Sequence, residues 1–328
     1  MIYAECPSGA RLGNWMFTYA AAVSTGEPVT VTGDEYARDV VCGKYRDLFR
    51  GARFAASVPD DIRTYVEPNL KAVHYAPLPV RKGEDLRIVG FFQSEKFLDE
   101  QKVRELYRIS PTRRTHLQTR YREVLAVRDI VAIHVRRGDY LRVGFHDPFV
   151  GEPYLRRAVN AFLDDGKTAF LVFSDDIPWC RRFFDRSEFA QARFWYSGND
   201  DPLDDLYLMS LCAHNVVSNS SFSWWGAWLN ENPSKRVIAP SMWFGFDTKR
   251  NSWGDIYFRG MEVVRSAYTL PLFVSAAYWY ARRAIGEADM AMRRLVLRTA
   301  GPRFAYALKG LLTRGRITSE FTGGDSRQ

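Results

Sequence analysis

The sequence predicts an α/β protein with two domains, each built around a parallel sheet. Short apolar runs alternate with helix-like segments along most of the chain, which is the pattern of strand–helix–strand units. Some runs, such as residues 130–135, are apolar on both faces, as expected of strands covered by helices on each side of a sheet. The length of 328 residues exceeds the usual size of a single domain.

The first domain is expected to cover residues 1–127. Residues 2–5 predict a strand that leads through a glycine-containing turn into a helix starting near Trp15, the opening unit of a nucleotide-type fold. The turn lacks the G-x-G-x-x-G spacing, so it is weak evidence for a dinucleotide. Little is assigned between residues 34 and 85. The other expected elements are strands at 29–32 and 87–92 and a helical stretch at 99–127.

The second domain is expected to cover residues 128–264. Pro153 suits the first turn of one helix, and Asp201 suits the start of another. The expected strands are 130–135, 169–173, 193–196, 216–217 and 237–240, and the expected helices are 152–163, 178–184, 201–213 and one that begins near Phe222.

Polar residues follow three of these strands, and ligands of open α/β sheets bind beyond the carboxyl ends of the strands. Arg136 and Arg137 follow the strand at 130–135, and their planar, permanently charged guanidiniums suit phosphate oxygens. The alternative is a solvated arginine pair with Asp139 as its ion-pair partner. The polar residues after the other two strands are Asp175 and Asp176, and Asn219, Ser220, Ser221 and Ser223.

The serine-rich stretch at 218–223 precedes a predicted helix. Ser220 or Ser221 suits the N-cap, where free N–H groups, the positive dipole end and hydroxyl groups form an anion site; the alternative is that the serines only cap the helix. Cations, carboxylates and hydroxyls together match the needs of a nucleoside diphosphate. No metal is expected, because the adjacent pair Asp175-Asp176 is weaker evidence for Mg²⁺ than D-x-D. The tryptophans of the helix are expected in the core.

The net charge of +8 favours polyanions, anionic membranes or phosphate-bearing substrates. Residues 281–316 hold nine Lys or Arg against two acidic residues, so the rest of the chain is nearly neutral, which argues against a nucleic-acid partner. The extension at 265–318 has apolar residues near helical spacing, which predicts a basic amphipathic helix at an anionic membrane surface. The alternative is a helix packed on the first domain. Residues 319–328 are expected to be disordered.

The chain is expected to be cytoplasmic and peripheral at the inner face of a membrane. Met1 leads directly into the first predicted strand without a signal peptide, and no apolar stretch reaches the roughly 18 residues of a membrane-spanning helix. The four cysteines form no CxxC pair, which favours reduced, buried thiols.

Two motifs carry a family resemblance. Residues 134–140, HVRRGDY, and residues 219–229, NSSFSWWGAWL, resemble the α-1,2-fucosyltransferases of glycosyltransferase family 11. Residues 9–20, GARLGNWMFTYA, are similar to that family's L-G-N-x-M-F segment, and residues 208–214 fit the helix before its serine loop. Trp15 departs from the family, in which many members carry Gln, and this affects the shape of the donor or acceptor pocket.

The resemblance implies a GT-B-like pair of Rossmann-type domains with a deep cleft, the first on the acceptor side and the second binding the GDP-sugar. It implies inverting, metal-independent transfer of L-fucose from GDP-β-L-fucose to the 2-hydroxyl of a galactose-containing glycan, without a cofactor. A lipid-linked acceptor would suit the basic extension. The implied donor-site residues are Arg136 and Arg137 at the β-phosphate with Ser221 and Ser223, His134 and Asp176 at the guanine, Asp175, Asn219 and Ser220 beside them, and Gly13 and Asn14 in a cleft loop near the fucose.

Inversion also requires a general base for the acceptor hydroxyl. Asp139 is the first candidate, and the alternative is that it braces Arg136 or Arg137; His146, Asp147 and Glu152 follow in the next loop. Arg136 is expected to stabilise the charge that develops on GDP. Two other functions stay open: a transferase that uses GDP-mannose or a rhamnose donor, and a basic protein that binds nucleic acid through residues 281–316.

Overall fold

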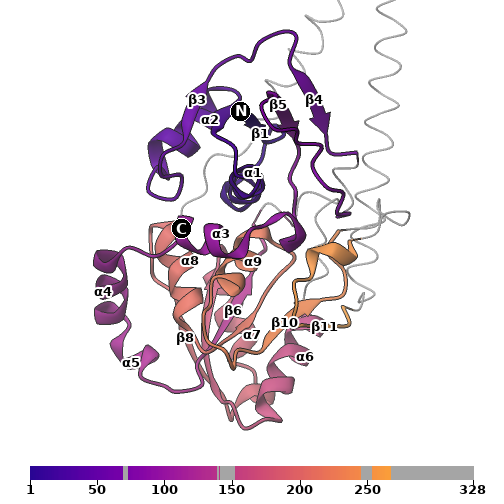
Figure 1. Ribbon diagram of the computed structural model, residues 1–328. Helices are drawn as coiled ribbons and strands as arrows, with labels where there is room; N and C mark the ends of the chain where they lie inside the picture. Colours follow the sequence, from indigo (N-terminus) through magenta and orange to yellow (C-terminus); the bar gives the residue numbers. More distant parts are fainter. Residues whose placement is uncertain (69–72, 139, 141–151, 245–252, 267–328) are drawn as a thin grey trace, which may run out of the picture. The chain divides into compact units, whose positions relative to one another are not determined.

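The computed structural model describes residues 1–68, 73–138, 140, 152–244 and 253–266 (Figure 1). Contacts divide the chain into two compact units, Met1–Thr269 and Leu270–Gln328, and all described residues belong to the first. This unit holds two parallel sheets, so the predicted class is confirmed: α/β, with two Rossmann-type sheets as in GT-B proteins. The predicted extension and tail, together with Asp139, His146 and Asp147, lie outside the described residues, apart from the first two residues of the extension.

The first sheet has the strand order β3-β2-β1-β5-β4, with every pair parallel. The buried side chains of Ile2 and Ala4 on the central strand form a small core with α1 and β5. The elements of this half are β1 (Ile2–Glu5), α1 (Leu12–Ser24), β2 (Val29–Thr32), α2 (Glu35–Arg38), a π-helix at Asp39–Lys44, β3 (Arg53–Ala55), β4 (Arg63–Val66), β5 (Leu86–Val89) and a 3-10 turn at Glu95–Phe97.

Two expectations for the first half were wrong, and two strands were missed. Helix α1 begins at Leu12 instead of near Trp15, so Gly13 and Asn14 lie in its first turn and not in a loop; Asn14 N and Trp15 N already donate to the carbonyl of Arg11. The strand predicted at 87–92 ends at Val89, because the chain turns at Phe92, whose φ is +50°. Strands β3 and β4 were not predicted; both are short edge strands with few buried side chains.

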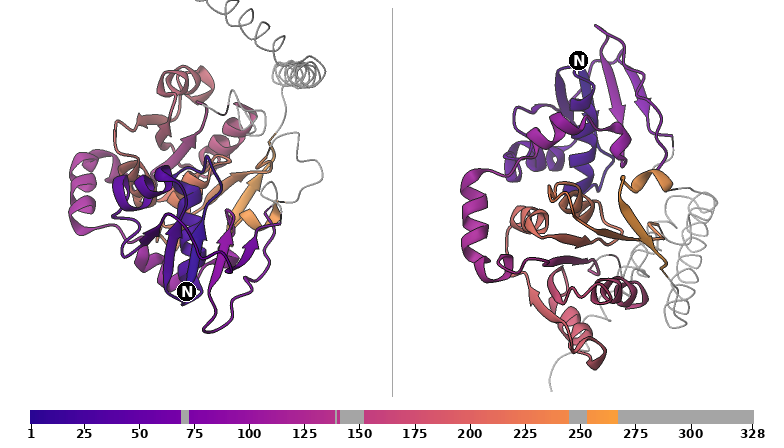
Figure 2. Two further views of the ribbon diagram at one scale, coloured as in Figure 1. Left: turned by 90° about the horizontal axis from the view of Figure 1, so that it is seen from above. Right: turned by 60° about the horizontal axis from the view of Figure 1, so that its bottom comes forward.

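The helical stretch predicted at 99–127 is three helices: α3 (Glu100–Leu106), α4 (Pro111–Arg120) and α5 (Arg122–Leu125). Helices α3 and α4 each begin at a cap of their own, and the second cap separates them. The side chain of Asp99 accepts a hydrogen bond from Lys102 N, and that of Ser110 accepts one from Arg113 N with Pro111 at the first helical position. Helix α4 then packs against α8, a helix of the second half (Figure 2).

The second sheet has the order β11-β10-β9-β6-β7-β8 and is also fully parallel. The chain runs outward from β6 through β7 to β8 and then crosses back to β9 on the other side of β6. The elements are β6 (Val131–Val135), α6 (Glu152–Leu163), β7 (Ala169–Ser174), α7 (Ile177–Phe184), a 3-10 turn at Ser187–Phe189, β8 (Arg193–Tyr196), α8 (Pro202–Leu211), β9 (His214–Val216), α9 (Ser221–Trp228), β10 (Val237–Pro240), a 3-10 turn at Gly254–Ile256 and β11 (Met261–Val264).

This order places the topological switch point between β6 and β9. The chain adds β7 and β8 on one side of this point, and β10 and β11 on the other. Ligands of doubly wound sheets bind in the crevice at the carboxyl ends of the strands at such a point. The predicted strands and helices of this half are present with small shifts at their ends. Strand β11 was not predicted, because Glu262 and Val263 are exposed on an edge strand.

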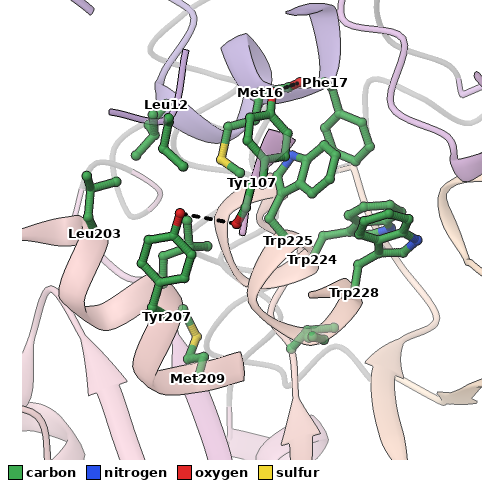
Figure 3. Packing of buried hydrophobic residues seen from close by; sticks show 14 of the residues in the cluster. Leu12, Met16, Phe17, Tyr107, Leu203, Tyr207, Met209, Trp224, Trp225 and Trp228 are labelled. Carbon is green, nitrogen blue, oxygen red and sulfur yellow. Dashed lines mark hydrogen bonds between the residues drawn. The ribbon is translucent and has the colours of Figure 1, made fainter. Parts of the chain in front are cut away.

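Helix α9 lies in the main core, as the tryptophans predicted (Figure 3). Trp224 and Trp225 are fully buried, and the ring of Phe17 from α1 lies 4.5 Å and 4.7 Å from their rings. Tyr107 donates a hydrogen bond to Met16 O from the other side. Aromatic rings packed at these distances are stabilised beyond the burial of their area. The helix that starts beside the switch point is therefore rigidly fixed against the first helix of the chain.

No described helix is long and apolar enough to cross a membrane.

Candidate functional site

His134 and Ser218 meet at the switch point. His134 is the fourth residue of β6, Ser218 follows β9, and the two strands are neighbours in register. His134 Nδ1 lies 2.7 Å from Ser218 Oγ, and both residues are buried. Ser218 belongs to the serine stretch but was not predicted as a site residue; its position two residues after the end of β9 was the available signal. This bond joins the end of β6 to the segment that follows β9.

The imidazole of His134 is neutral near pH 7. Burial, with the nearby Arg136 charge, lowers the pKa of His134 to about 3. A neutral imidazole carries one N–H donor and one acceptor nitrogen. His134 is therefore suited to hydrogen bonds with an uncharged group and adds no positive charge for a phosphate.

The two arginines and the two aspartates, which the sequence placed at neighbouring strand ends, form ion pairs with each other. Arg136 Nη1 lies 2.9 Å from Asp175 Oδ2, and Arg137 Nε lies 3.1 Å from Asp176 Oδ2. Asp175 also accepts a hydrogen bond from Arg137 N at 2.9 Å. A Cβ on Gly138 would lie 2.5 Å from Asp175 Oδ2, so this close approach requires glycine. The carboxylates thus orient the guanidiniums.

Two aromatic rings also hold the arginines. The guanidinium of Arg137 lies 3.9 Å from the centre of the Trp179 ring, while Asp176 caps α7 by accepting from Trp179 N. The guanidinium of Arg136 lies 5.4 Å from the Tyr140 ring, whose hydroxyl donates to Asn219 O. No site role was predicted for either ring. Trp179 lies far from Arg137 in the chain, whereas Tyr140, four residues after Arg136, stands within the motif HVRRGDY. Tyr140 joins the arginine loop to the serine stretch.

The N terminus of α9 presents donors on the same side. Ser220 is the N-cap, yet its side chain makes no capping bond, so the alternative that the serines only cap the helix is wrong for it. No described residue accepts a hydrogen bond from the backbone N–H groups of Ser221, Phe222 and Ser223. A helix N terminus with free N–H groups attracts anions through these donors and the helix dipole.

The predicted serines and Asn219 differ in whether their side chains already form hydrogen bonds within the protein. Ser223 is 1% exposed, and its hydroxyl bonds to Ser220 O at 3.2 Å and lies 3.4 Å from Ser218 Oγ. Asn219 is 4% exposed and donates to Trp243 O at 3.1 Å. These two side chains shape the serine stretch from inside. Ser220 is 7% exposed, and its Oγ has no hydrogen-bond partner among the described residues.

Gly13 and Asn14 bring the start of α1 against the start of α9. A Cβ on Gly13 would lie 2.6 Å from Ser221 Oγ and 2.7 Å from Phe222 N. Trp225 Nε1 donates to Gly13 O, and Ser221 Oγ donates to Asn14 Oδ1. Glycine at position 13 therefore allows the first turns of α1, in the first half, and α9, in the second half, to touch.

Glu152, one of the candidate bases, is held by arginine at the start of α6. Its two carboxylate oxygens accept hydrogen bonds from Arg186 at 2.8 Å and 3.0 Å, and this contact lowers the pKa of Glu152. Within the described part of the chain, no cluster of three His, Cys, Asp or Glu side chains could hold a metal ion. The carboxylates of Asp175 and Asp176 instead form ion pairs that orient Arg136 and Arg137.

A doubly wound sheet with paired arginines and a helix N terminus at its switch point is the arrangement of a nucleotide-binding α/β protein. Residues 62–257, more than half of the chain, match the model of Glycosyl transferase family 11. The protein therefore belongs to this family of glycosyltransferases, as the sequence motifs predicted.

Three curated relatives share parts of the chain. Over 126 residues it is 35% identical to the O-antigen biosynthesis glycosyltransferase WbnK of Escherichia coli, covering 36% of this chain and 40% of that protein. Over 169 residues it is 31% identical to an alpha-1,2-colitosyltransferase of Escherichia coli, covering 48% and 56%. Over 159 residues it is 30% identical to the galactoside alpha-(1,2)-fucosyltransferase 1 of Saimiri boliviensis boliviensis, covering 44% and 43%. The matched segments thus span about half the length of these relatives.

Solved structures are similar to the chain at low identity. A crystal structure of POFUT1 in complex with GDP has 11% identity and a TM-score of 0.43, covering 75% of this chain and 99% of that one. The NodZ alpha-1,6-fucosyltransferase soaked with GDP-fucose has 13% identity and a TM-score of 0.43, covering 74% and 94%.

Proposed function

We propose that the protein is an inverting α-1,2-fucosyltransferase that moves L-fucose from GDP-β-L-fucose to the 2-hydroxyl of a galactose-containing glycan. The observation that carries the proposal is the pairing of an arginine loop with a helix N terminus across the switch point of the second sheet, in a member of a glycosyltransferase family. Relatives named for α-1,2 transfer of fucose and of colitose support the linkage.

The diphosphate of the donor would lie between the arginines and α9. Breaking the bond between sugar and phosphate builds negative charge on GDP, and donors that are already oriented stabilise that charge without reorganisation. Asp175 and Asp176 hold Arg136 and Arg137 in place before the donor arrives. Ser220 Oγ and the N–H groups of α9 complete the anion site.

The guanine and the acceptor would use other groups. His134 offers a neutral, buried ring for hydrogen bonding to the base, and Asp176 stays the second expected contact. Inversion places the acceptor hydroxyl on the face of the fucose opposite GDP, with a general base to take its proton. Asp139 is our proposed base. Arg186 neutralises Glu152 and makes it a weaker candidate. No metal is proposed, because arginines and helix N–H groups supply the positive charge.

The donor test is calorimetric binding of GDP in the presence of EDTA. We expect micromolar binding by the wild type, weakened roughly 10- to 100-fold in Arg136→Ala, because a charge-assisted hydrogen bond to phosphate is lost. Arg193→Ala is the matched control. Arg193 stacks on Trp195 and is the first residue of β8, whereas Arg136 follows the carboxyl end of β6. Wild type that binds GDP only after Mg²⁺ is added, or not at all, contradicts the proposal.

The sugar is then identified by transfer assays with GDP-fucose, GDP-mannose, a rhamnose donor and a colitosyl donor on galactosides. We expect GDP-fucose to be used best. A colitosyl donor used better than GDP-fucose would assign the enzyme to the activity of its colitosyltransferase relative, and transfer from GDP-mannose or the rhamnose donor alone would support the other alternative.

We further propose that the acceptor is lipid-linked and that the enzyme acts at the inner face of a membrane, held by the basic residues of 281–316. Each Lys or Arg near an anionic surface contributes about 1 kcal/mol of attraction. The full-length protein should sediment with vesicles containing phosphatidylserine and be released by salt. Equal sedimentation with neutral and anionic vesicles would contradict this.

A further inference from the structure

Asn14 accepts two hydrogen bonds on one oxygen, and the two donors come from different halves of the molecule. Gln93 Nε2 lies 2.7 Å from Asn14 Oδ1, and Ser221 Oγ lies 2.8 Å from the same atom. Gln93 follows β5 of the first sheet, while Ser221 is the first residue of α9. Asn14 thus joins the segment that follows β5 of the first sheet to the start of α9.

These two donors determine which way the amide of Asn14 faces. With Oδ1 turned toward Gln93 and Ser221, the NH₂ group points away from both. Asn14 is half-buried, and its Nδ2 has no acceptor among the described residues. The side chain therefore presents two N–H donors beside the N terminus of α9, where the backbone N–H groups of Ser221 and Phe222 also lack an acceptor in the described residues.

The segment that carries Gln93 is itself fixed. Glu67, which is 7% exposed, accepts hydrogen bonds on Oε2 from Phe91 N at 2.7 Å and Phe92 N at 3.2 Å. Phe92 has a φ of +50°, and within the described chain it is the sole residue other than glycine with positive φ. A strained backbone of this kind persists only where its surroundings hold it. Thr18 Oγ1 binds Gly90 O at 2.8 Å and ties the segment to α1.

We propose that Gln93 is a positioning residue for sugar transfer: it orients the amide of Asn14 so that its N–H groups meet an oxygen of the bound donor. Glu67 supports this by fixing residues 90–93. The inference rests on the proposed function. The ligand atom is a hydrogen-bond acceptor beside the start of α9, either a phosphate oxygen of GDP or an oxygen of the sugar, and the two sources are separated by the test below.

Gln93→Glu is the decisive variant. A glutamate carboxylate fits the same space but only accepts hydrogen bonds, so the Asn14 amide must turn over to donate to it. Its oxygen then faces the ligand. We expect kcat/KM to fall roughly tenfold or more, as for loss of a ligand hydrogen bond plus a repulsive contact. Relative to wild type, activity should recover at acidic pH, because the introduced carboxyl group, once protonated, donates to Asn14 again.

A purely structural role of Gln93 predicts a different pattern. In that case Gln93→Glu, which keeps a hydrogen bond to Asn14, should resemble the wild type at every pH, and Gln93→Ala alone should be impaired together with its melting temperature. That result would overturn the proposal. Thermal unfolding of every variant is therefore measured alongside activity.

A double-mutant cycle shows whether Gln93 acts through Asn14. We expect Gln93→Ala to lower kcat/KM in the wild type but to change it little in an Asn14→Ala background. Additive effects would overturn the proposal. Asn14→Asp keeps the oxygen acceptor for Gln93 and Ser221 but loses the N–H donors; weaker GDP binding in this variant assigns the phosphate, and unchanged GDP binding with reduced transfer assigns the sugar.

Wild-type controls separate this inference from the proposed function. If wild type binds GDP but transfers none of the tested sugars, the proposed function fails, and the cycle is read through GDP binding. If it does not bind GDP either, the inferred contact of Asn14 with the donor fails together with the proposed function. Coupling between Gln93 and Asn14 in GDP binding or transfer supports the inference; coupling in thermal unfolding alone, or no coupling, overturns it.

Discussion

His134 Nδ1 and Ser218 Oγ lie 2.7 Å apart and join the ends of β6 and β9 across the switch point of the second sheet. Both residues are buried, so the bond is shielded from water. It connects the strand that leads into the arginine loop with the segment that leads into α9. The arginine loop and the N terminus of α9 are the two sources of positive charge in the site, and the bond between His134 and Ser218 connects the segments that lead into them.

The burial of His134 makes the stability of the protein depend on pH. Its pKa is about 3 in the folded protein, against about 6.5 in an unfolded chain, so the unfolded state binds more protons between these values. The free energy of unfolding should fall as the pH drops below about 6.5, by at most about 1.4 kcal/mol per pH unit from this group. Urea unfolding of wild type and His134→Gln across this range measures the difference, and parallel curves would exclude His134 as its source.

Gly13→Ala should destabilise the contact between α1 and α9. The new Cβ would lie under 3 Å from Ser221 Oγ and from the backbone at Phe222 N, neither of which can easily move. Overpacking of this kind costs about 1–3 kcal/mol of unfolding free energy. Gly198→Ala is the control, because its Cβ would meet only the side-chain end of Arg120 at 3.7 Å. Equal melting temperatures for the two variants would contradict the prediction.

Ser220 and Ser223 should respond differently to alanine. The hydroxyl of Ser220 is uncommitted, so Ser220→Ala should weaken GDP binding several-fold, by about 1 kcal/mol, and leave the melting temperature unchanged. Ser223 is buried and bonded to Ser220 O, so Ser223→Ala should lower the melting temperature more than Ser220→Ala does. Calorimetry and thermal unfolding on both variants check this. The reverse pattern would mean that Ser223 faces the ligand.

Trp179→Leu should weaken GDP binding through Arg137. The guanidinium lies 3.9 Å from the ring centre, and a cation–π contact at such a site contributes about 0.5–1 kcal/mol. We therefore expect a roughly two- to fivefold rise in Kd, smaller than that of Arg137→Ala. Trp195→Leu removes a similar contact with Arg193 and serves as control. If Trp179→Leu binds GDP as the wild type does, Asp176 alone is enough to orient Arg137.

Much of the second half could be predicted because its signals are local. The apolar run ending at Val135 gave β6, Pro153 gave the start of α6, and Trp224 and Trp225 gave the buried helix. Local signals failed at three of the four sheet edges, all but β8. Strands β3, β4 and β11 are short and partly exposed, so no apolar alternation marks them, and only pairing with a neighbour makes them strands.

The sequence by itself determined the alternation of strands and helices, the family, and the residue types at the strand ends. Only the tertiary structure decided that Arg136 meets Asp175, that Gly13 meets Ser221, and that Gln93 and Ser221 share one oxygen of Asn14. These contacts join residues far apart in the chain. They depend on strand order and on how two helices cross, and both are set by packing of the whole core, which no local pattern of residues encodes.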